Sequence, residues 1–139
     1  MIEAIRYHDF CAGHRVAGHE NKCAHLHGHN YRIYFHCTAE STDKLGRVID
    51  FSVIKATLCE WLEDNCDHRF LVWEEDPLAN DIAKLDDATV KLPFNPTAEN
   101  MAQYLVETVA PEMLKDSGVT LYKCVVEETR KCSASYTKP

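Results

Sequence analysis

The chain has 139 residues, which is the size of one domain, and we expect a single domain over residues 1–139. Hydrophobic residues make up 45% and charged residues 27% of the chain, values that exclude an intrinsically disordered protein or a coiled coil. The formal net charge of -7 argues against a nucleic-acid partner, because an acidic surface repels phosphate backbones.

The first half of the sequence predicts two antiparallel strands followed by a helix. Residues 1–12 are rich in apolar side chains, and residues 31–39 alternate between apolar and polar with the period of a strand. The loop over residues 13–21 is rich in His and Gly and too long for a tight hairpin, which favours a functional role. Asp50 can cap a helix over residues 51–63, where apolar residues recur at three- and four-residue spacing.

The second half predicts another helix and two more strands. Between the two helices the periodicity is lost, so we expect mostly loop with a short helix near residues 78–85. The second helix begins at residues 95–97 and ends at Pro111. Residues 119–128 and 132–137 are rich in Val, Tyr and Thr, which favours strands. The order β-β-α-α-β-β indicates an α+β fold.

The cysteine content and the N-terminus bear on location. No stretch of the sequence is long and apolar enough to predict a membrane span, and the N-terminus lacks the basic-then-apolar order of a signal peptide. The seven cysteines are odd in number and irregularly spaced, which favours reduced thiols in a cytoplasmic protein that has no membrane partner. Eight histidines beside them suggest a zinc site.

The densest group of potential zinc ligands surrounds His27-Gly28-His29. Residues two apart in an extended segment face the same side, so His27 and His29 can bind one ion, and His14 can supply a third imidazole. Three imidazoles without a fourth protein ligand are typical of an open, catalytic zinc site. Two other interpretations stay open: solvated loop histidines, and a closed structural zinc site that includes Cys23.

Three further positions suggest proton transfer or ligand binding. Cys23 precedes the histidine pair closely enough for its thiol to lie beside the metal as a general base. Asp67 can orient and charge His68 as a proton donor, although adjacent Asp and His residues are also common on surfaces. Glu127 and Glu128 point to opposite faces of a strand, and the apolar neighbours of Glu128 favour it as the buried one. A buried carboxylate can bind a guanidine-like ligand edge; an ordinary acidic strand end is the alternative.

Six motifs, in this order, resemble the family of 6-pyruvoyl-tetrahydropterin and 6-carboxy-tetrahydropterin synthases. They lie at residues 10–14, 23–31, 46–51, 67–71, 96–100 and 128–129. The resemblance implies a tunnelling fold (T-fold), in which the antiparallel sheets of several subunits close into one barrel. It also implies a homohexamer, formed as a dimer of trimers.

The resemblance further implies zinc ligands, proton-transfer residues and substrate-binding residues. These are His14, His27 and His29 for Zn2+; Cys23, Asp67 and His68 for proton transfer; and Glu128, Thr97 and Glu99 for the pterin pocket. Active sites are expected to be shared, so that Cys23 of one subunit meets the Asp67–His68 pair of another.

The spacing around Cys23 favours one branch of this family. Three residues separate Cys23 from His27, as in the bacterial carboxy-forming enzymes of queuosine biosynthesis, whereas the animal pyruvoyl-forming branch has a longer gap. The resemblance therefore implies a zinc-dependent lyase that converts 7,8-dihydroneopterin triphosphate to 6-carboxy-5,6,7,8-tetrahydropterin, acetaldehyde and triphosphate. A 6-pyruvoyl-tetrahydropterin synthase that eliminates triphosphate from the same substrate is one alternative. A non-catalytic zinc-binding scaffold is the other.

An acidic protein that binds a triphosphate needs positive charge near the substrate. The candidates are Arg15, Lys22, Arg32 and Lys131.

Overall fold

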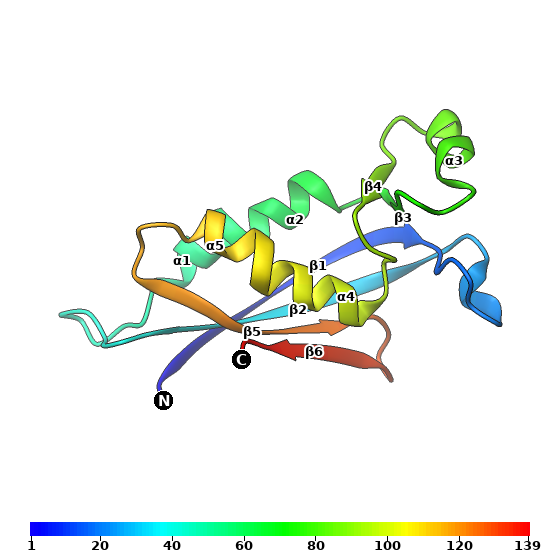
Figure 1. Cartoon of the computed structure of the whole chain (residues 1–139). Helices are drawn as coiled ribbons and strands as arrows, with labels where there is room; N and C mark the ends of the chain where they lie inside the picture. Colours follow the sequence, from blue (N-terminus) through cyan, green and yellow to red (C-terminus); the bar gives the residue numbers. More distant parts are fainter.

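The computed structural model describes all 139 residues and contains one six-stranded sheet in the order β4-β3-β1-β2-β5-β6 (Figure 1). Its strands are β1 (Glu3–His14), β2 (His27–Ala39), β3 (Phe70–Trp73), β4 (Val90–Leu92), β5 (Val119–Glu127) and β6 (Ser133–Thr137). The four long strands pair antiparallel, as the sequence predicts. The two short strands β3 and β4 add to β1 in parallel.

The pairing of β1 with β2 determines which side chains meet at the end of the sheet. The register runs without interruption from Glu3 opposite Thr38 to His14 opposite His27. Side chains alternate between the two faces of the sheet. From Phe10 onward, the even-numbered residues of β1 lie on the same face as the odd-numbered residues of β2. This common face is buried, so the predicted zinc ligands continue the row of core side chains.

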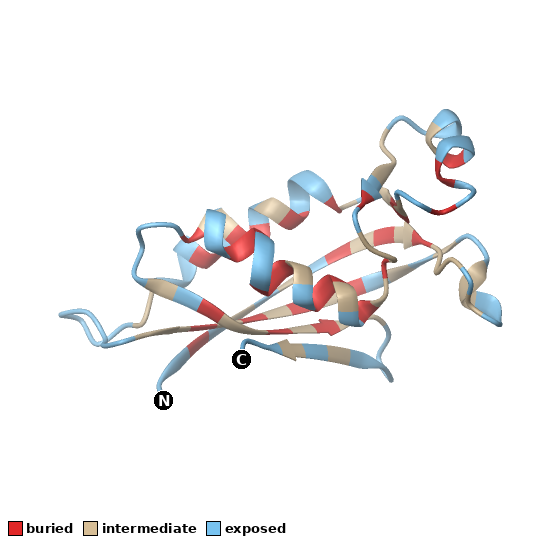
Figure 2. Cartoon of the chain, viewed as in Figure 1, coloured by how far each residue is buried: buried red, intermediate tan, exposed pale blue.

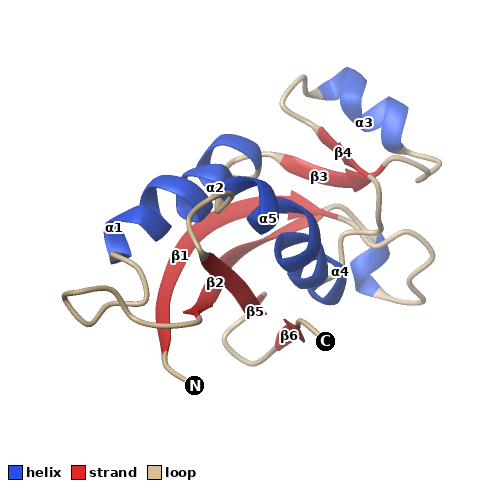
Figure 3. Cartoon of the chain, turned by 60° about the vertical axis from the view of Figure 1, so that its left-hand side comes forward, coloured by secondary structure: helices blue, strands red, loops and turns tan.

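Two helical segments cover the buried face of the sheet (Figures 1 and 3). The first comprises α1 (Phe51–Ile54), a π-helical turn (Lys55–Cys59) and α2 (Glu60–Asn65). The second comprises α4 (Ala98–Tyr104), another π-helical turn (Leu105–Val109) and α5 (Ala110–Met113). Both begin at side-chain caps: Asp50 accepts from the Ser52 N–H at 2.9 Å, and Thr97 accepts from the Asn100 N–H at 3.1 Å.

The predicted end of the second helix at Pro111 is wrong, because the helix continues to Met113. The residues before Pro111 form the π-helical turn, in which backbone hydrogen bonds join residues five apart instead of four apart. Pro111 then stands in the first turn of α5, where a missing N–H is tolerated. No helix combines the length and the apolar character needed to cross a bilayer.

The core lies between these helices and the sheet. Ile54, Leu58 and Leu62 from the first segment and Leu105 from the second are all buried against strand residues such as Phe35. Figure 2 shows that buried residues line the helix surfaces that face the sheet, whereas the outward surfaces are exposed. Burial of this apolar area, at about 25 cal/mol per Å², is the main stabilising contribution.

The segment between the two helical segments holds more structure than the sequence predicts. The short helix α3 (Ala79–Leu85) confirms the expected helix near residues 78–85. The strands β3 and β4 were not predicted, because three or four residues are too few for a periodic pattern. Asp76 is only 4% exposed and its carboxylate accepts from Arg15 at 2.7 Å, which ties this segment to the loop after β1.

Three strand edges in the sheet lack a neighbour, namely those of β4, of β6 and of most of β1. β1 pairs with β3 only at Gly13 and His14, so its edge from Glu3 to Ala12 has no strand beside it. β6 forms the outer edge on the other side of the sheet. Ile5 and Tyr7, on the free part of β1, are 43% and 48% exposed. Such edges favour pairing with a strand of another chain.

Candidate active site

His14, His27 and His29 meet at one end of the buried face. His14 ends β1 and stands opposite His27, the first residue of β2, and His29 follows on the same face. The ring centroids lie 4.6 Å apart for His14 and His27, 5.1 Å for His14 and His29, and 4.9 Å for His27 and His29. The three side chains therefore form one compact cluster, as expected from their spacing in the sequence.

Hydrogen bonds orient two of the three rings. Nδ1 of His14 lies 2.8 Å from the carbonyl oxygen of Pro96, and Nδ1 of His27 lies 2.8 Å from that of His25. Since a carbonyl can only accept, each Nδ1 is assigned as the protonated donor, and each Nε2 keeps its lone pair. The two Nε2 atoms lie 3.1 Å apart, an arrangement in which two lone pairs repel unless a cation or a proton lies between them.

The third ring supports the same interpretation. Nε2 of His29 is buried and has no hydrogen-bond partner. A buried polar atom without a partner destabilises a protein by about 1–3 kcal/mol, so such an atom points to a bound group. Three imidazole nitrogens that converge in this way fit the ligand set of a zinc ion.

The environment favours the neutral, metal-binding form of two of these imidazoles, His14 and His29. Burial lowers the pKa of His14 to about 4, against the opposing effect of the hydrogen bond to Pro96. Burial also lowers the pKa of His29, although the Glu128 carboxylate acts in the opposite direction. At neutral pH neither ring needs to lose a proton before it binds a cation.

Glu128 lies beside this cluster, directly after the end of β5. Its Oε1 atom is 3.4 Å from Nε2 of His14 and 3.7 Å from Nε2 of His29. The side chain is 24% exposed and borders an open cavity of about 590 Å³. Glu127 pairs in register with Arg32 and also borders this cavity, but it forms no ion pair with the histidines. One carboxylate and one imidazole cluster therefore share the wall of a cavity large enough for a small molecule.

Asp67 and His68 form a second polar group, in the turn after α2. Nδ1 of His68 donates to Oδ2 of Asp67 at 2.8 Å. Although burial acts to raise it, hydrogen bonds from His68 and from the Cys11 N–H lower the pKa of Asp67 below its usual range. His68 has a φ of 58°, in the left-handed region that residues other than glycine rarely adopt. Strained backbone of this kind occurs most often at functional sites.

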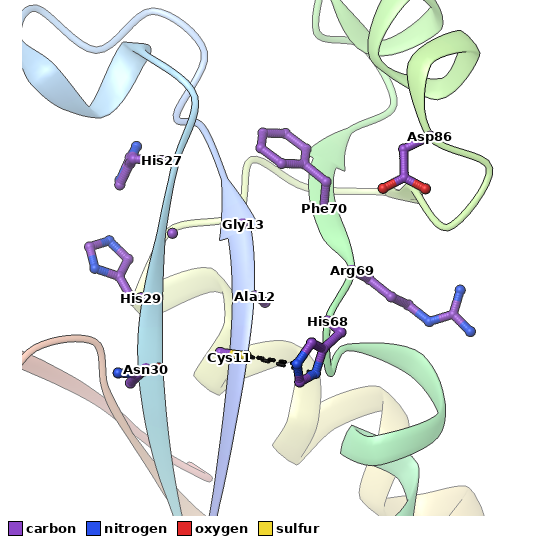
Figure 4. Close-up of a pocket in the computed structure, with 11 residues that line it drawn as sticks. Cys11, Ala12, Gly13, His27, His29, Asn30, His68, Arg69, Phe70 and Asp86 are labelled. Carbon is purple, nitrogen blue, oxygen red and sulfur yellow. Dashed lines mark hydrogen bonds between the residues drawn. The ribbon is translucent and has the colours of Figure 1, made fainter.

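The two groups lie on opposite sides of the β1–β2 pair. Figure 4 shows His27 and His29 on one side of the strands and His68 on the other, beyond β1. Cys11 lies between Phe10 and Ala12, which face the core, so its side chain lies on the opposite face of β1, on the side of His68. A pocket of about 490 Å³ extends across this end of the strands and is lined by His27 and His29 as well as by His68.

Three predicted site residues form no side-chain hydrogen bond or ion pair with either group. Cys23 lies half-buried in a 3₁₀ turn, Lys22–Ala24, where its carbonyl accepts from the Val16 N–H at 2.7 Å. Thr97 caps α4 and is adjacent to Pro96, whose carbonyl orients His14. Glu99 is exposed in the first turn of α4 and makes neither a hydrogen bond nor an ion pair.

The structure brings Cys11 to the Asp67–His68 pair, a contact that the sequence did not predict. Its Sγ atom lies 3.6 Å from Nε2 and 3.7 Å from Nδ1 of His68, and 4.0 Å from Oδ1 of Asp67. These residues are 56 or more positions apart in the chain, so no local pattern could have indicated the contact. The only available signal was the alternation of β1, which places Cys11 off the core face.

Two of the four candidate phosphate-binding residues are already paired with carboxylates. Arg15 binds the buried Asp76, and Arg32 donates twice to Asp9, at 2.7 Å and 2.9 Å. Arg130, which was not among the candidates, borders the cavity beside Glu128.

Comparisons with known proteins agree with the resemblance in the sequence. A family model described as 6-pyruvoyl tetrahydropterin synthase matches residues 3–139. The 6-carboxy-5,6,7,8-tetrahydropterin synthase of Rickettsia typhi is 38% identical over 137 residues, which cover 95% of this chain and 97% of that protein. The enzyme of the same name from Haemophilus influenzae is 30% identical over 131 residues, which cover 88% and 93%.

Solved structures show the same fold. An uncharacterised protein from Wolinella succinogenes has a TM-score of 0.86 at 23% identity and covers 99% of this chain and 98% of its own. The 6-pyruvoyl tetrahydropterin synthase of Caenorhabditis elegans has a TM-score of 0.70 at 27% identity and covers 99% and 96%. These similarities confirm the predicted α+β tunnelling fold, with the parallel strands β3 and β4 as an addition.

Proposed function

Because the chain belongs to the 6-pyruvoyl tetrahydropterin synthase family, we propose that it converts 7,8-dihydroneopterin triphosphate to 6-carboxy-5,6,7,8-tetrahydropterin, acetaldehyde and triphosphate. The curated relatives are 6-carboxy-5,6,7,8-tetrahydropterin synthases, so the chain is an enzyme of a lyase family. We assign the reaction to queuosine biosynthesis in the cytoplasm, in line with the short gap between Cys23 and His27.

The observation that carries this proposal is the convergence of three imidazole nitrogens, one of them buried without a partner. His14, His27 and His29 would hold the zinc ion. When bound, zinc acts as a Lewis acid that lowers the pKa of the hydroxyls on the substrate side chain and stabilises charge on their oxygens.

Glu128 is suited to hold the pterin ring beside this cluster. Its carboxylate borders the cavity, and the amino and ring N–H groups of a pterin present two donors to one carboxylate. Each charge-assisted hydrogen bond contributes roughly 1.5–3 kcal/mol to binding. Arg130, on the same cavity, supplies positive charge for the triphosphate. Thr97 would act through Pro96 and the orientation of His14, and Glu99 would reach the pocket from the start of α4.

We assign proton transfer to Cys23, Asp67 and His68. The hydrogen bond to Asp67 fixes the ring of His68 and leaves its Nε2 atom free, and the His68 side chain is 78% exposed. Such an imidazole can donate a proton to the substrate or accept one from it. Cys23 would take the proton on carbon.

We infer that an active site built from both groups is assembled from more than one chain. Within one chain His68 lies on the other side of β1 and β2 from His27 and His29 (Figure 4). The free edges of β1 and β6 offer a way to join the sheets of neighbouring chains into a closed barrel. We therefore propose a homohexamer, a dimer of trimers, in which the Asp67–His68 pair of one subunit completes the site of another.

Product analysis tests the proposal. The enzyme is incubated with 7,8-dihydroneopterin triphosphate, released acetaldehyde is trapped, and the pterin product is identified by mass spectrometry. We expect acetaldehyde and the 6-carboxy product in equal amounts. The 6-pyruvoyl product without acetaldehyde would indicate the second candidate, which the family model and the Caenorhabditis elegans structure favour. Neither product would indicate a zinc-binding scaffold.

A further inference from the structure

The contact between Cys11 and the Asp67–His68 pair has no role in the reaction proposed above. We propose that Cys11 and His68, supported by Asp67, form a second and weaker zinc site, and that a zinc ion there inhibits the enzyme. The inhibition rests on the proposed function, because it requires His68 to transfer protons; the metal site does not.

The distances between the donor atoms fit a zinc ion. Zn–S and Zn–N bonds of roughly 2.3 Å and 2.0–2.1 Å at a tetrahedral angle separate the two donor atoms by about 3.5 Å. The observed distance between Sγ of Cys11 and Nε2 of His68 is 3.6 Å. Oδ1 of Asp67 lies 4.0 Å from the same sulfur and accepts from the Cys11 N–H, so Asp67 supports the two ligands from outside the site. Because Sγ is almost equally far from Nε2 and Nδ1 of His68, at 3.6 Å and 3.7 Å, the imidazole must turn before its Nε2 lone pair and the sulfur can bind one ion.

Hydrogen bonds hold the donors in this arrangement. The His68 N–H donates to the Cys11 carbonyl at 2.7 Å, and the Cys11 N–H donates to Oδ1 of Asp67 at 3.2 Å. Nδ1 of His68 donates to Oδ2 of Asp67, so Nε2 is the nitrogen left for a metal. A carboxylate that accepts from the second nitrogen of a metal-bound imidazole is the usual outer partner in zinc sites.

The chemistry of binding makes this site weaker than the three-histidine cluster. On binding, the Cys11 thiol releases its proton to solvent and the sulfur bonds to zinc, while His68 contributes the lone pair of Nε2. Water fills the open positions, since only two side chains bind directly. In the single chain the His68 side chain is 78% exposed. A zinc ion on Nε2 blocks the atom that would otherwise exchange protons with the substrate.

Metal content tests the site without reference to activity. Protein is equilibrated with excess zinc, and metal is counted before and after dialysis against zinc-free buffer. We expect a second zinc ion per chain that dialysis removes, and its absence in Cys11→Ser. The matched control is Cys132→Ser, which removes an exposed thiol elsewhere and should keep the second ion. Equal zinc content in wild type and Cys11→Ser would overturn the proposal.

Cobalt provides a second measurement, specific for sulfur. The second equivalent of Co2+ should produce the near-ultraviolet absorption of a thiolate bound to cobalt, because the three-histidine cluster contains no sulfur. Cys11→Ser should lose this absorption, whereas Cys132→Ser and Cys23→Ala should keep it. Two results would contradict the site: no thiolate absorption in the wild type, or loss of that absorption in Cys23→Ala and not in Cys11→Ser.

Turnover tests the inhibition. Activity in excess zinc is divided by activity at one zinc per chain for each variant, which cancels differences in basal rate. We expect at least a tenfold loss in wild type and in Cys132→Ser, and little loss in Cys11→Ser. Equal inhibition of all three would refute the regulatory role. If no variant turns over the substrate, the proposed function fails, while zinc content and cobalt absorption still decide the metal site.

Discussion

The carbonyl oxygen of Pro96 lies 2.8 Å from Nδ1 of His14, although the two residues are 82 positions apart in the chain. Pro96 stands immediately before Thr97, the cap of α4, so the start of that helix sets the orientation of the imidazole. The ring therefore presents Nε2 to His27. The helix layer and the sheet jointly determine the geometry of the proposed zinc site.

Removal of one of the three histidines should weaken zinc binding strongly. We expect His29→Ala to raise the Kd for zinc at least about 100-fold, because two imidazoles remain and a whole ligand is lost. His36→Ala is the matched control, since His36 lies on the same strand but faces Glu3 on the other side of the sheet. Competition with a chromophoric chelator measures both. Similar zinc affinity in His29→Ala and wild type would exclude the three-histidine site.

Cys23→Ala should keep zinc and lose nearly all turnover. The thiol lies in the 3₁₀ turn and not among the three clustered imidazoles, so its removal leaves the zinc ligands intact. Loss of the general base should lower kcat by roughly 10²–10⁴-fold. Elemental analysis and steady-state kinetics on the same sample check both statements. Zinc loss in proportion to activity would point to a closed structural site that includes Cys23.

Glu128→Gln should raise KM at least tenfold, because the amide replaces one acceptor with a donor and removes the charge. Glu127→Gln is the matched control, since the Glu127 side chain forms no ion pair with the histidines and its replacement should change KM little. Zinc content should be unchanged in both variants. If Glu128→Gln released zinc, the carboxylate would be a metal ligand, which its 3.4 Å distance from Nε2 of His14 also permits.

The metal-free protein should lose stability as the pH falls. The pKa of His14 is lowered from 6.5 to about 4 in the folded chain, so the unfolded chain binds the proton more readily. The free energy of unfolding is therefore unaffected by His14 above pH 6.5 and falls progressively towards pH 4, by at most about 3 kcal/mol. Urea denaturation at pH 7 and pH 4.5 after chelator treatment measures this loss. The His14→Gln variant should lose less stability than the wild type between pH 7 and pH 4.5. An equal loss in both proteins would show that groups other than His14 cause it.

Inactive variants should complement each other if the active site is shared. Cys23→Ala and His68→Ala chains, mixed under conditions that allow subunit exchange, should regain activity because some sites combine an intact Cys23 with an intact His68. Each variant alone, treated in the same way, is the control. Analytical ultracentrifugation should give a hexamer. A fully active monomer, or the absence of any regain despite exchange, would contradict the shared site.

Much of the fold could be predicted from local patterns. The alternation over residues 31–39 is the direct signature of a strand with one buried face, and Asp50 and Thr97 begin helices because their side chains bind N–H groups within the next turn. The three clustered histidines were predictable for the same reason. His27 and His29 are two residues apart on one strand, and His14 ends the strand that pairs with it.

Other features depend on contacts between distant parts of the chain. The strands β3 and β4 are too short to have a pattern of their own, and pairing with the end of β1 stabilises them. The contacts of Cys11 with His68 and of Pro96 with His14 join residues 57 and 82 positions apart. The separation of His68 from the three histidines likewise follows from the path of the chain around β1. Periodicity describes neighbours within a few residues, whereas strand pairing and helix packing decide which distant side chains meet.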